Sequence, residues 1–106
     1  MNIDVSQKIT TLDGTTIPAS DGVSGELRPT VLKDILVKAM IEPSQGEAQT
    51  MKGEVKFQRY MLAQKIYQSE GVVDFEIEDL ALLRESVGKL FGPLVVGQVW
   101  SMLEGK

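Results

Sequence analysis

The chain has 106 residues, of which 42% are hydrophobic and 25% are charged, so we expect one globular domain with a core of its own. Fifteen acidic and 11 basic residues give a net charge of −4 without a basic cluster, and we therefore expect no direct nucleic-acid binding. The absence of Cys and His excludes disulfides, thiol nucleophiles, imidazole bases and the usual zinc sites.

The first segment of the chain predicts a β-hairpin over residues 3–17. β-favouring residues are frequent in it, and Ile3 and Val5 begin an alternating apolar face. Asp13-Gly14 is a strong signal for the connecting turn, because Gly accepts the positive φ that a tight turn requires. A lone hairpin is marginal in water, so it has to pack on the helices that follow.

Residues 18–28 are rich in Gly and Ser and predict a loop, and a helix is expected over residues 29–42. Pro29 is allowed in a first helical turn, whereas Pro43 cannot continue the helix. The apolar residues between the two prolines follow helical spacing and form one face: Leu32, Ile35, Leu36, Ala39 and Met40. The polar stretch 43–50 predicts another loop.

A second helix is predicted over residues 51–69, with Gly71 at the position of a C-terminal cap. Its apolar face is expected to contain Val55, Leu62, Ala63 and Ile66. Three aromatic residues flank that face: Phe57, Tyr60 and Tyr67. Three basic residues are expected to point away from it: Lys56, Arg59 and Lys65.

A short β-like piece from Val72 to Phe75 precedes a third helix, predicted over residues 77–91. Its apolar residues repeat at intervals of three or four: Leu80, Leu83, Val87 and Leu90. Acidic residues in its first turn and Lys89 near its end both suit the helix dipole. Gly92-Pro93 ends this helix.

The segment GPLVVGQVW, from Gly92 to Trp100, carries no charge and allows two interpretations. One is a buried strand, and the other is a helix over residues 93–104 with Pro93 at its first position. We expect the helix. Gly97 in its interior costs about 1 kcal/mol relative to Ala, which the close approach of another backbone would offset.

The predicted fold is therefore α+β and mainly α, in a single domain over residues 1–106. An N-terminal β-hairpin is followed by three to four packed helices. No stretch approaches the ~20 consecutive apolar residues that a membrane-spanning helix needs. Residues 1–10 lack the basic start and apolar run of a signal peptide. We expect a cytoplasmic protein without a membrane partner.

Motifs that carry chemistry are weak in this chain. Ser86 and Lys89 match the SxxK pair of penicillin-binding enzymes, but the other motifs and the larger scaffold are missing, so we expect surface residues. Four acids resemble an EF-hand loop, yet Asp79 replaces its turn glycine: Asp74, Glu76, Glu78 and Glu85. No pair of carboxylates stands out for hydrolysis. We expect no catalytic site, metal or cofactor.

Six aromatic residues are expected mainly in the core, with a binding surface as the alternative: Phe57, Tyr60, Tyr67, Phe75, Phe91 and Trp100. The apolar C-terminal segment is the exception, because an exposed apolar patch of a few hundred Å2 marks an interaction site and Trp is enriched at hot spots. The candidate interface consists of Val95, Val96, Val99, Trp100 and Leu103. The alternative is that this segment belongs to the core.

Several stretches resemble a small family of phage and prophage proteins. They are LDGT at 12–15, KFQRYMLAQKIY at 56–67 and EDLALLRESVGKLFGPLVVGQVW at 78–100. Members share an LDG hairpin, an RYxLAxKIY helix and a GPLVVGQ-type C-terminus, and the family has no settled biochemical function. The resemblance implies a helical accessory protein of phage origin in the cytoplasm of the host cell.

We expect a non-enzymatic phage accessory protein that acts by protein–protein interaction, as an assembly chaperone or adaptor. The alternative is a phage-encoded inhibitor of a host protein, such as a defence nuclease or the transcription machinery. The partner is then a phage structural or assembly protein, or a host protein, and a homo-oligomer is also compatible with the sequence. A third hypothesis, a carboxylate hydrolase, requires a shielded acid with a raised pKa.

Overall fold

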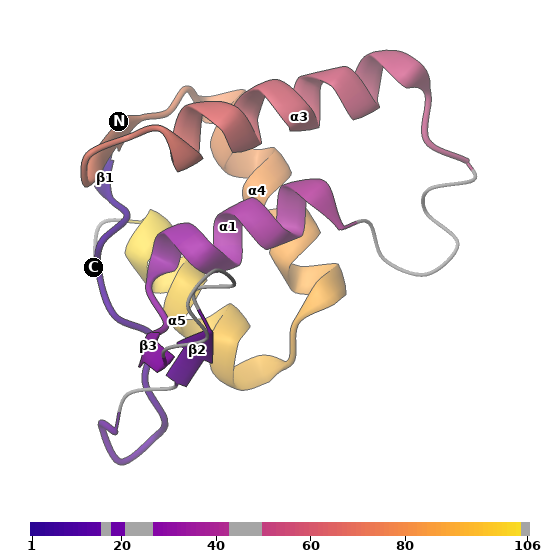
Figure 1. Ribbon diagram of the computed structural model, residues 1–106. Coiled ribbons are helices and arrows are strands. Elements are labelled where there is room, and N and C mark those ends of the chain that lie inside the picture. Colours follow the sequence, from indigo (N-terminus) through magenta and orange to yellow (C-terminus); the bar gives the residue numbers. More distant parts are fainter. Residues whose placement is uncertain (16–17, 21–26, 43–49, 105–106) are drawn as a thin grey trace.

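The computed structural model describes residues 1–15, 18–20, 27–42 and 50–104 (Figure 1). Four helices are assigned in these residues: α1 (Leu32–Ile41), α3 (Gly53–Tyr67), α4 (Ile77–Leu90) and α5 (Pro93–Leu103). The strands are short: β1 (Asn2–Asp4), β2 (Pro18–Ser20), β3 (Leu27–Pro29) and β4 (Val72–Asp74). The expected α+β, mainly α fold with an N-terminal hairpin is confirmed.

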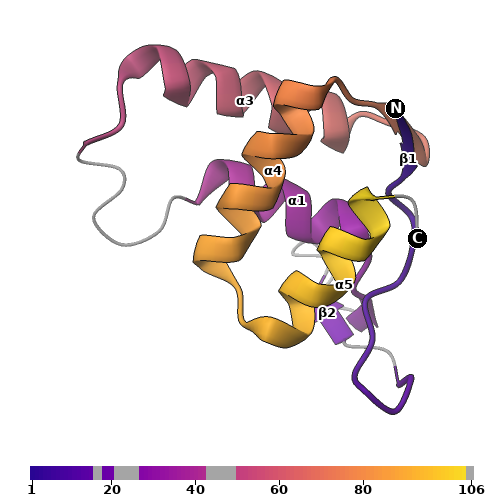
Figure 2. The same ribbon diagram turned by 180° about the vertical axis from the view of Figure 1, so that it is seen from behind.

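Each of the four helices lies within the range that its sequence pattern predicts, and GPLVVGQVW forms a helix rather than a strand. α3 and α4 both pack on α1, and α5 packs on α4 (Figure 2). The largest fully buried side chains come from all four helices, from the N-terminal segment and from the residue after β4: Val5, Ile9, Leu32, Leu36, Ile66, Phe75, Leu83, Val87 and Val99. Among the described helices, none has the length and apolar character needed to cross a membrane.

The hairpin lies later in the chain than residues 3–17. It is formed by β2 and β3, which pair antiparallel with Ala19 opposite Arg28. β1 pairs instead with β4, and Ile3 stands opposite Val73. Both of these side chains are buried, so the pairing closes one edge of the core. Residues 16–17, 21–26 and 43–49, parts of the predicted hairpin and loops, are outside the described residues.

The Asp13-Gly14 turn is present without the predicted hairpin ladder. Gly14 has φ +89°, and its N–H donates to the carbonyl of Thr11 at 3.0 Å. The Asp13 carboxylate accepts hydrogen bonds from the hydroxyl of Thr11 and, at 3.0 Å, from the N–H of Thr15. These bonds favour the charged form, the Thr11 bond most, and lower the pKa of Asp13 to about 2.

The N-terminal segment completes the start of α1. The first N–H groups of a helix have no partner within it, and Val31, which precedes α1, has no capping side chain. Instead the N–H of Leu32 donates to the carbonyl of Gln7, and that of Lys33 donates to the carbonyl of Val5, both at 2.8 Å. Backbone that was expected to pair in a hairpin thus caps a helix.

The same segment is also attached to α5. The side-chain amide of Gln98 accepts from the N–H of Thr10 at 2.9 Å and donates to the carbonyl of Thr10 at 2.6 Å. A side chain thereby satisfies both backbone groups of Thr10, as a neighbouring strand would.

Arg59 completes the other end of α1. Its side chain is only 5% exposed, so the expectation that it points away from the core is wrong. Nη2 donates to the carbonyl of Ala39 at 2.7 Å and Nε to that of Met40 at 3.3 Å. The last carbonyls of α1 end inside the protein and carry the negative end of the helix dipole, which explains why a buried cation is stable here.

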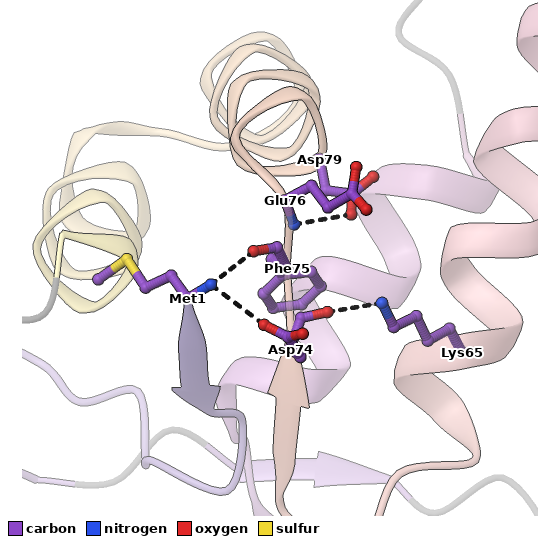
Figure 3. A network of polar contacts seen from close by, with 6 residues as sticks. All are labelled: Met1, Lys65, Asp74, Phe75, Glu76 and Asp79. Carbon is purple, nitrogen blue, oxygen red and sulfur yellow. Dashed lines mark hydrogen bonds and ion pairs between the residues drawn. The ribbon is translucent and has the colours of Figure 1, made fainter.

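A polar network joins β1, β4 and the start of α4 (Figure 3). The amino group of Met1 donates to the Asp74 carboxylate at 3.1 Å, and Lys65 Nζ donates to the carbonyl of Asp74 at 2.5 Å. The N–H of Glu76 donates to the Asp79 carboxylate at 3.1 Å. The predicted acidic first turn of α4 therefore caps that helix.

Replacing Arg59 by Met should lower the free energy of unfolding by about 2–3 kcal/mol, because buried carbonyls of α1 lose their charged donor. Urea denaturation followed by circular dichroism measures this. Lys56→Met, on the exposed side of the same helix, should change stability by less than about 0.5 kcal/mol. Equal stability of the two variants would show that Arg59 does not hold the end of α1.

The Asp13 carboxyl should titrate at about pH 2 in a carbon-detected NMR titration. Because the folded pKa lies below the ordinary value of 3.8, the turn is fully stabilised above pH 3.8 and loses this contribution as the pH falls through about 2. Thr11→Val should raise the pKa of Asp13, whereas Thr11→Ser should retain the low value. An unchanged pKa in Thr11→Val would contradict the assignment.

Candidate protein-binding surface

The candidate interface on α5 is divided between core and surface. Val99 and Leu103 are buried in the core of the folded chain, which is the alternative that the sequence left open for this segment. They occupy the side of α5 that packs on the rest of the protein. Val95 and Val96 are half-buried against the same core.

Trp100 is 37% exposed and is held against α4. The guanidinium of Arg84 lies 4.8 Å from the centre of the indole ring, and Nε1–H donates to the carbonyl of Arg84 at 3.2 Å. Arg84 also forms an ion pair with Glu104 at 3.4 Å. The indole therefore joins α4 to α5 through both its face and its polar edge.

The six aromatic residues expected in the core are also divided. Phe75 is buried and Phe91 is half-buried, but the three aromatic residues of α3 are exposed. With two neighbours on the same helix they form an uncharged surface, called here the aromatic face: Phe57, Tyr60, Met61, Gln64 and Tyr67. Its four apolar and aromatic members are each between 47% and 71% exposed.

The position of α3 explains this exposure. α1 and α4 lie on the same side of α3, which runs along one edge of the molecule (Figures 1 and 2). Leu62 and Ile66 on the inner side are buried. Since a helix turn takes about 3.6 residues, Phe57 and Gln64 fall on the opposite side. No other described helix covers that side.

A groove between α1 and α3 adjoins the aromatic face. It has a volume of about 300 Å3 and is lined by Val37, Ile41, Tyr60, Ala63, Gln64 and Tyr67. A second hollow of about 670 Å3 shares three of these residues and continues along α1. Its rim is charged: Lys33, Asp34, Lys38 and Glu42. An apolar centre with a charged rim is the usual construction of a protein-binding site.

The charges of this rim hold the scaffold in place. Lys33 Nζ donates to the carbonyls of Tyr67 at 3.3 Å and Ser69 at 2.7 Å, and so ties the start of α1 to the end of α3. Asp34 accepts from the N–H of Val31 at 3.0 Å and caps α1. These contacts fix Tyr67 at the end of the groove.

Among the described residues, neither a metal-binding cluster nor the SxxK pair forms a site. These residues include no cluster of three or more acidic, Cys or His side chains that could hold a metal ion. Ser86 is buried, contrary to expectation, whereas Lys89 is exposed and pairs with Glu85 at 3.0 Å. The SxxK residues therefore do not act as a pair.

Sequence reasoning favoured the core over a binding surface for the aromatic residues of α3, because large aromatic side chains are usually buried. The available signal was the presence of apolar residues on both sides of one helix. Phe57, Tyr60 and Tyr67 lie on a different side from Leu62 and Ile66, and a helix at the edge of a small protein buries only one side.

Gly97 of α5 offers a test of how closely that helix is packed. An added Cβ would meet nothing within 4 Å, so no close approach of another backbone among the described residues offsets the cost of Gly97. Gly97→Ala should raise the free energy of unfolding by about 0.5–1 kcal/mol, since Ala favours the helix. Gly71→Ala should lower it, because Gly71 has φ +128°. A destabilised Gly97→Ala in thermal unfolding would reveal a contact at this position.

Comparison with known proteins identifies no relative of this chain. The resemblance to phage proteins therefore stays a prediction from the quoted motifs. No protein-family model matches the chain, and no curated protein or solved structure is significantly similar to it.

Proposed function

We propose that the protein is a non-enzymatic interaction module that binds a protein partner through the aromatic face of α3 and the adjoining groove. The observation that carries this proposal is the exposure of Phe57, Tyr60 and Tyr67 on one uncharged helix surface. Exposed apolar patches of this kind mark interaction sites, and Tyr, Phe and Met are enriched at protein interfaces.

The size of the surface supports the proposal. Four members of the aromatic face and Ile41 at the end of α1 are each at least 47% exposed. Taking roughly 200 Å2 for each large side chain when fully exposed, they present roughly 600 Å2 together. That is at the upper end of the largest patches found on monomeric proteins, roughly 300–600 Å2.

Asp4 and Asp13, two acids with lowered pKa values, do not suit carboxylate catalysis. Hydrogen bonds from Ser6 lower the pKa of Asp4, and those from Thr11 and Thr15 lower the pKa of Asp13. Both acids are exposed and belong to the N-terminal segment. A general acid requires the opposite shift, in a shielded pocket.

Two biological roles are proposed for this binding activity. The first is that of a phage accessory protein in the host cytoplasm, acting as an assembly chaperone or adaptor. The second is inhibition of a host protein, such as a defence nuclease or the transcription machinery. Both roles require an accessible, uncharged binding surface, and the aromatic face of α3 supplies one.

Substitution of the aromatic face should remove binding without unfolding the protein. The test uses a tagged chain in the cells that produce it, with chemical cross-linking and identification of the bound proteins. Tyr60→Ser with Tyr67→Ser should lose the partner, and with purified partner the dissociation constant should rise about 30-fold or more, as for interface hot spots.

A matched control removes exposed apolar surface elsewhere. Ile77 is 82% exposed and Leu12 is 96% exposed, and neither lies on α3. The variant Ile77→Ser with Leu12→Ser should retain the partner. Unfolding curves of both variants should stay close to that of the unmodified chain. Equal retention of the partner by the two variants would overturn the proposed function.

A further inference from the structure

The aromatic face has the spacing of a helix-pairing seam. Phe57, Tyr60, Gln64 and Tyr67 are separated by three, four and three residues. This is the a/d pattern by which two helices pack along their length. The residues that would point away from such a partner, Arg59, Leu62 and Ile66, are the ones that pack in the core of the protein.

The seam is also complementary to itself in the antiparallel direction. In a symmetric dimer every contact occurs twice: a residue of the first copy contacts a different residue of the second copy, and the same two positions meet again with the copies exchanged. An antiparallel pair centred on the middle of α3 places Phe57 against Tyr67 of the second copy, and Tyr60 against Gln64. The first pair stacks two rings, and the second joins a hydroxyl to an amide.

The flanking charges select the same direction. Lys56 lies beside the seam at one end, and Glu70 follows the other end of α3; both are exposed. Antiparallel pairing brings Lys56 of one copy toward Glu70 of the other. Parallel pairing would remove this contact, because it places the Lys56 end of one helix far from the Glu70 end of the other.

The exposed area matches what a dimer needs. Two copies that each contribute roughly 600 Å2 bury roughly 1,200 Å2, the lower limit of a stable specific interface. Pairing also covers Ile41, which lines the groove beside Tyr60 and Tyr67.

We propose that the occupant of the aromatic face is a second copy of this chain, bound through antiparallel pairing of α3 with α3. This inference rests on the proposed function, because it takes the aromatic face as the binding surface: a second copy covers that face in the free protein, and a partner in either proposed role has to displace it. A heterologous protein in place of the second copy is an outcome of the test.

The first experiment is sedimentation equilibrium over a wide range of concentrations. The mass should rise from the 11.6 kDa of one chain toward twice that value. Tyr60→Asp should remain a monomer with unchanged circular dichroism, and Ile77→Asp should dimerise as the unmodified chain does. Lys56→Glu should weaken the dimer, and the double variant Lys56→Glu with Glu70→Lys should restore it.

The second experiment tests the direction of the pair. The chain has no Cys, so introduced thiols are the only ones present. A mixture of Tyr60→Cys and Gln64→Cys chains, carrying tags of different mass, should form mixed disulfide dimers on mild oxidation. Parallel pairing would instead cross-link Gln64→Cys chains with each other, and that result would overturn the antiparallel arrangement.

The outcomes separate this inference from the proposed function. A mass of one chain at all concentrations would overturn the dimer. If Tyr60→Ser with Tyr67→Ser still loses an identified partner that the control variant retains, the proposed function stands with a heterologous occupant. If neither self-association nor partner binding depends on Tyr60, both proposals fail.

Discussion

The arrangement of this protein depends on the two ends of α1, which both lie against other parts of the chain and leave backbone groups in need of partners. At the start of α1 the donors bond to the carbonyls of Val5 and Gln7, and at its end Arg59 bonds to the carbonyls of Ala39 and Met40. The second contact fixes the rotation of α3. Since a helix turn takes about 3.6 residues, an inward Arg59 turns Phe57 and Met61 outward. One buried cation thus determines which side of α3 meets solvent.

The helices follow from sequence because their periodicity is a local property. Leu32, Ile35, Leu36, Ala39 and Met40 are spaced as one helical face, and all five are buried in α1. The β1–β4 pairing could not be predicted in this way, because Ile3 and Val73 are distant in the sequence and each strand has only three residues. Arg59 was misplaced for a different reason: a charged residue is normally solvated, and its burial depends on carbonyls contributed by another helix.

In the candidate site, too, the sequence reveals which residues are apolar, but only the packing of the helices decides which of them are buried. The apolar character of α5 is visible in the sequence, but only packing decides that Val99 and Leu103 close the core. The aromatic character of α3 is equally visible, and only the edge position of that helix leaves it uncovered. In a chain of this size the number of apolar faces exceeds the number of neighbours available to cover them. The surplus surface on α3 is where a function by association is best placed.

The stacking of Arg84 on the single tryptophan has a practical consequence. Trp100 lies where α4 meets α5 and is absent from the lining of the α1–α3 groove. Its fluorescence therefore reports the separation of α4 from α5 when the protein unfolds, and is expected to change little when a partner covers α3. Folding and the proposed association thus have distinct optical signatures, the first from the indole of α5 and the second from Tyr60 and Tyr67, the two tyrosines of the chain.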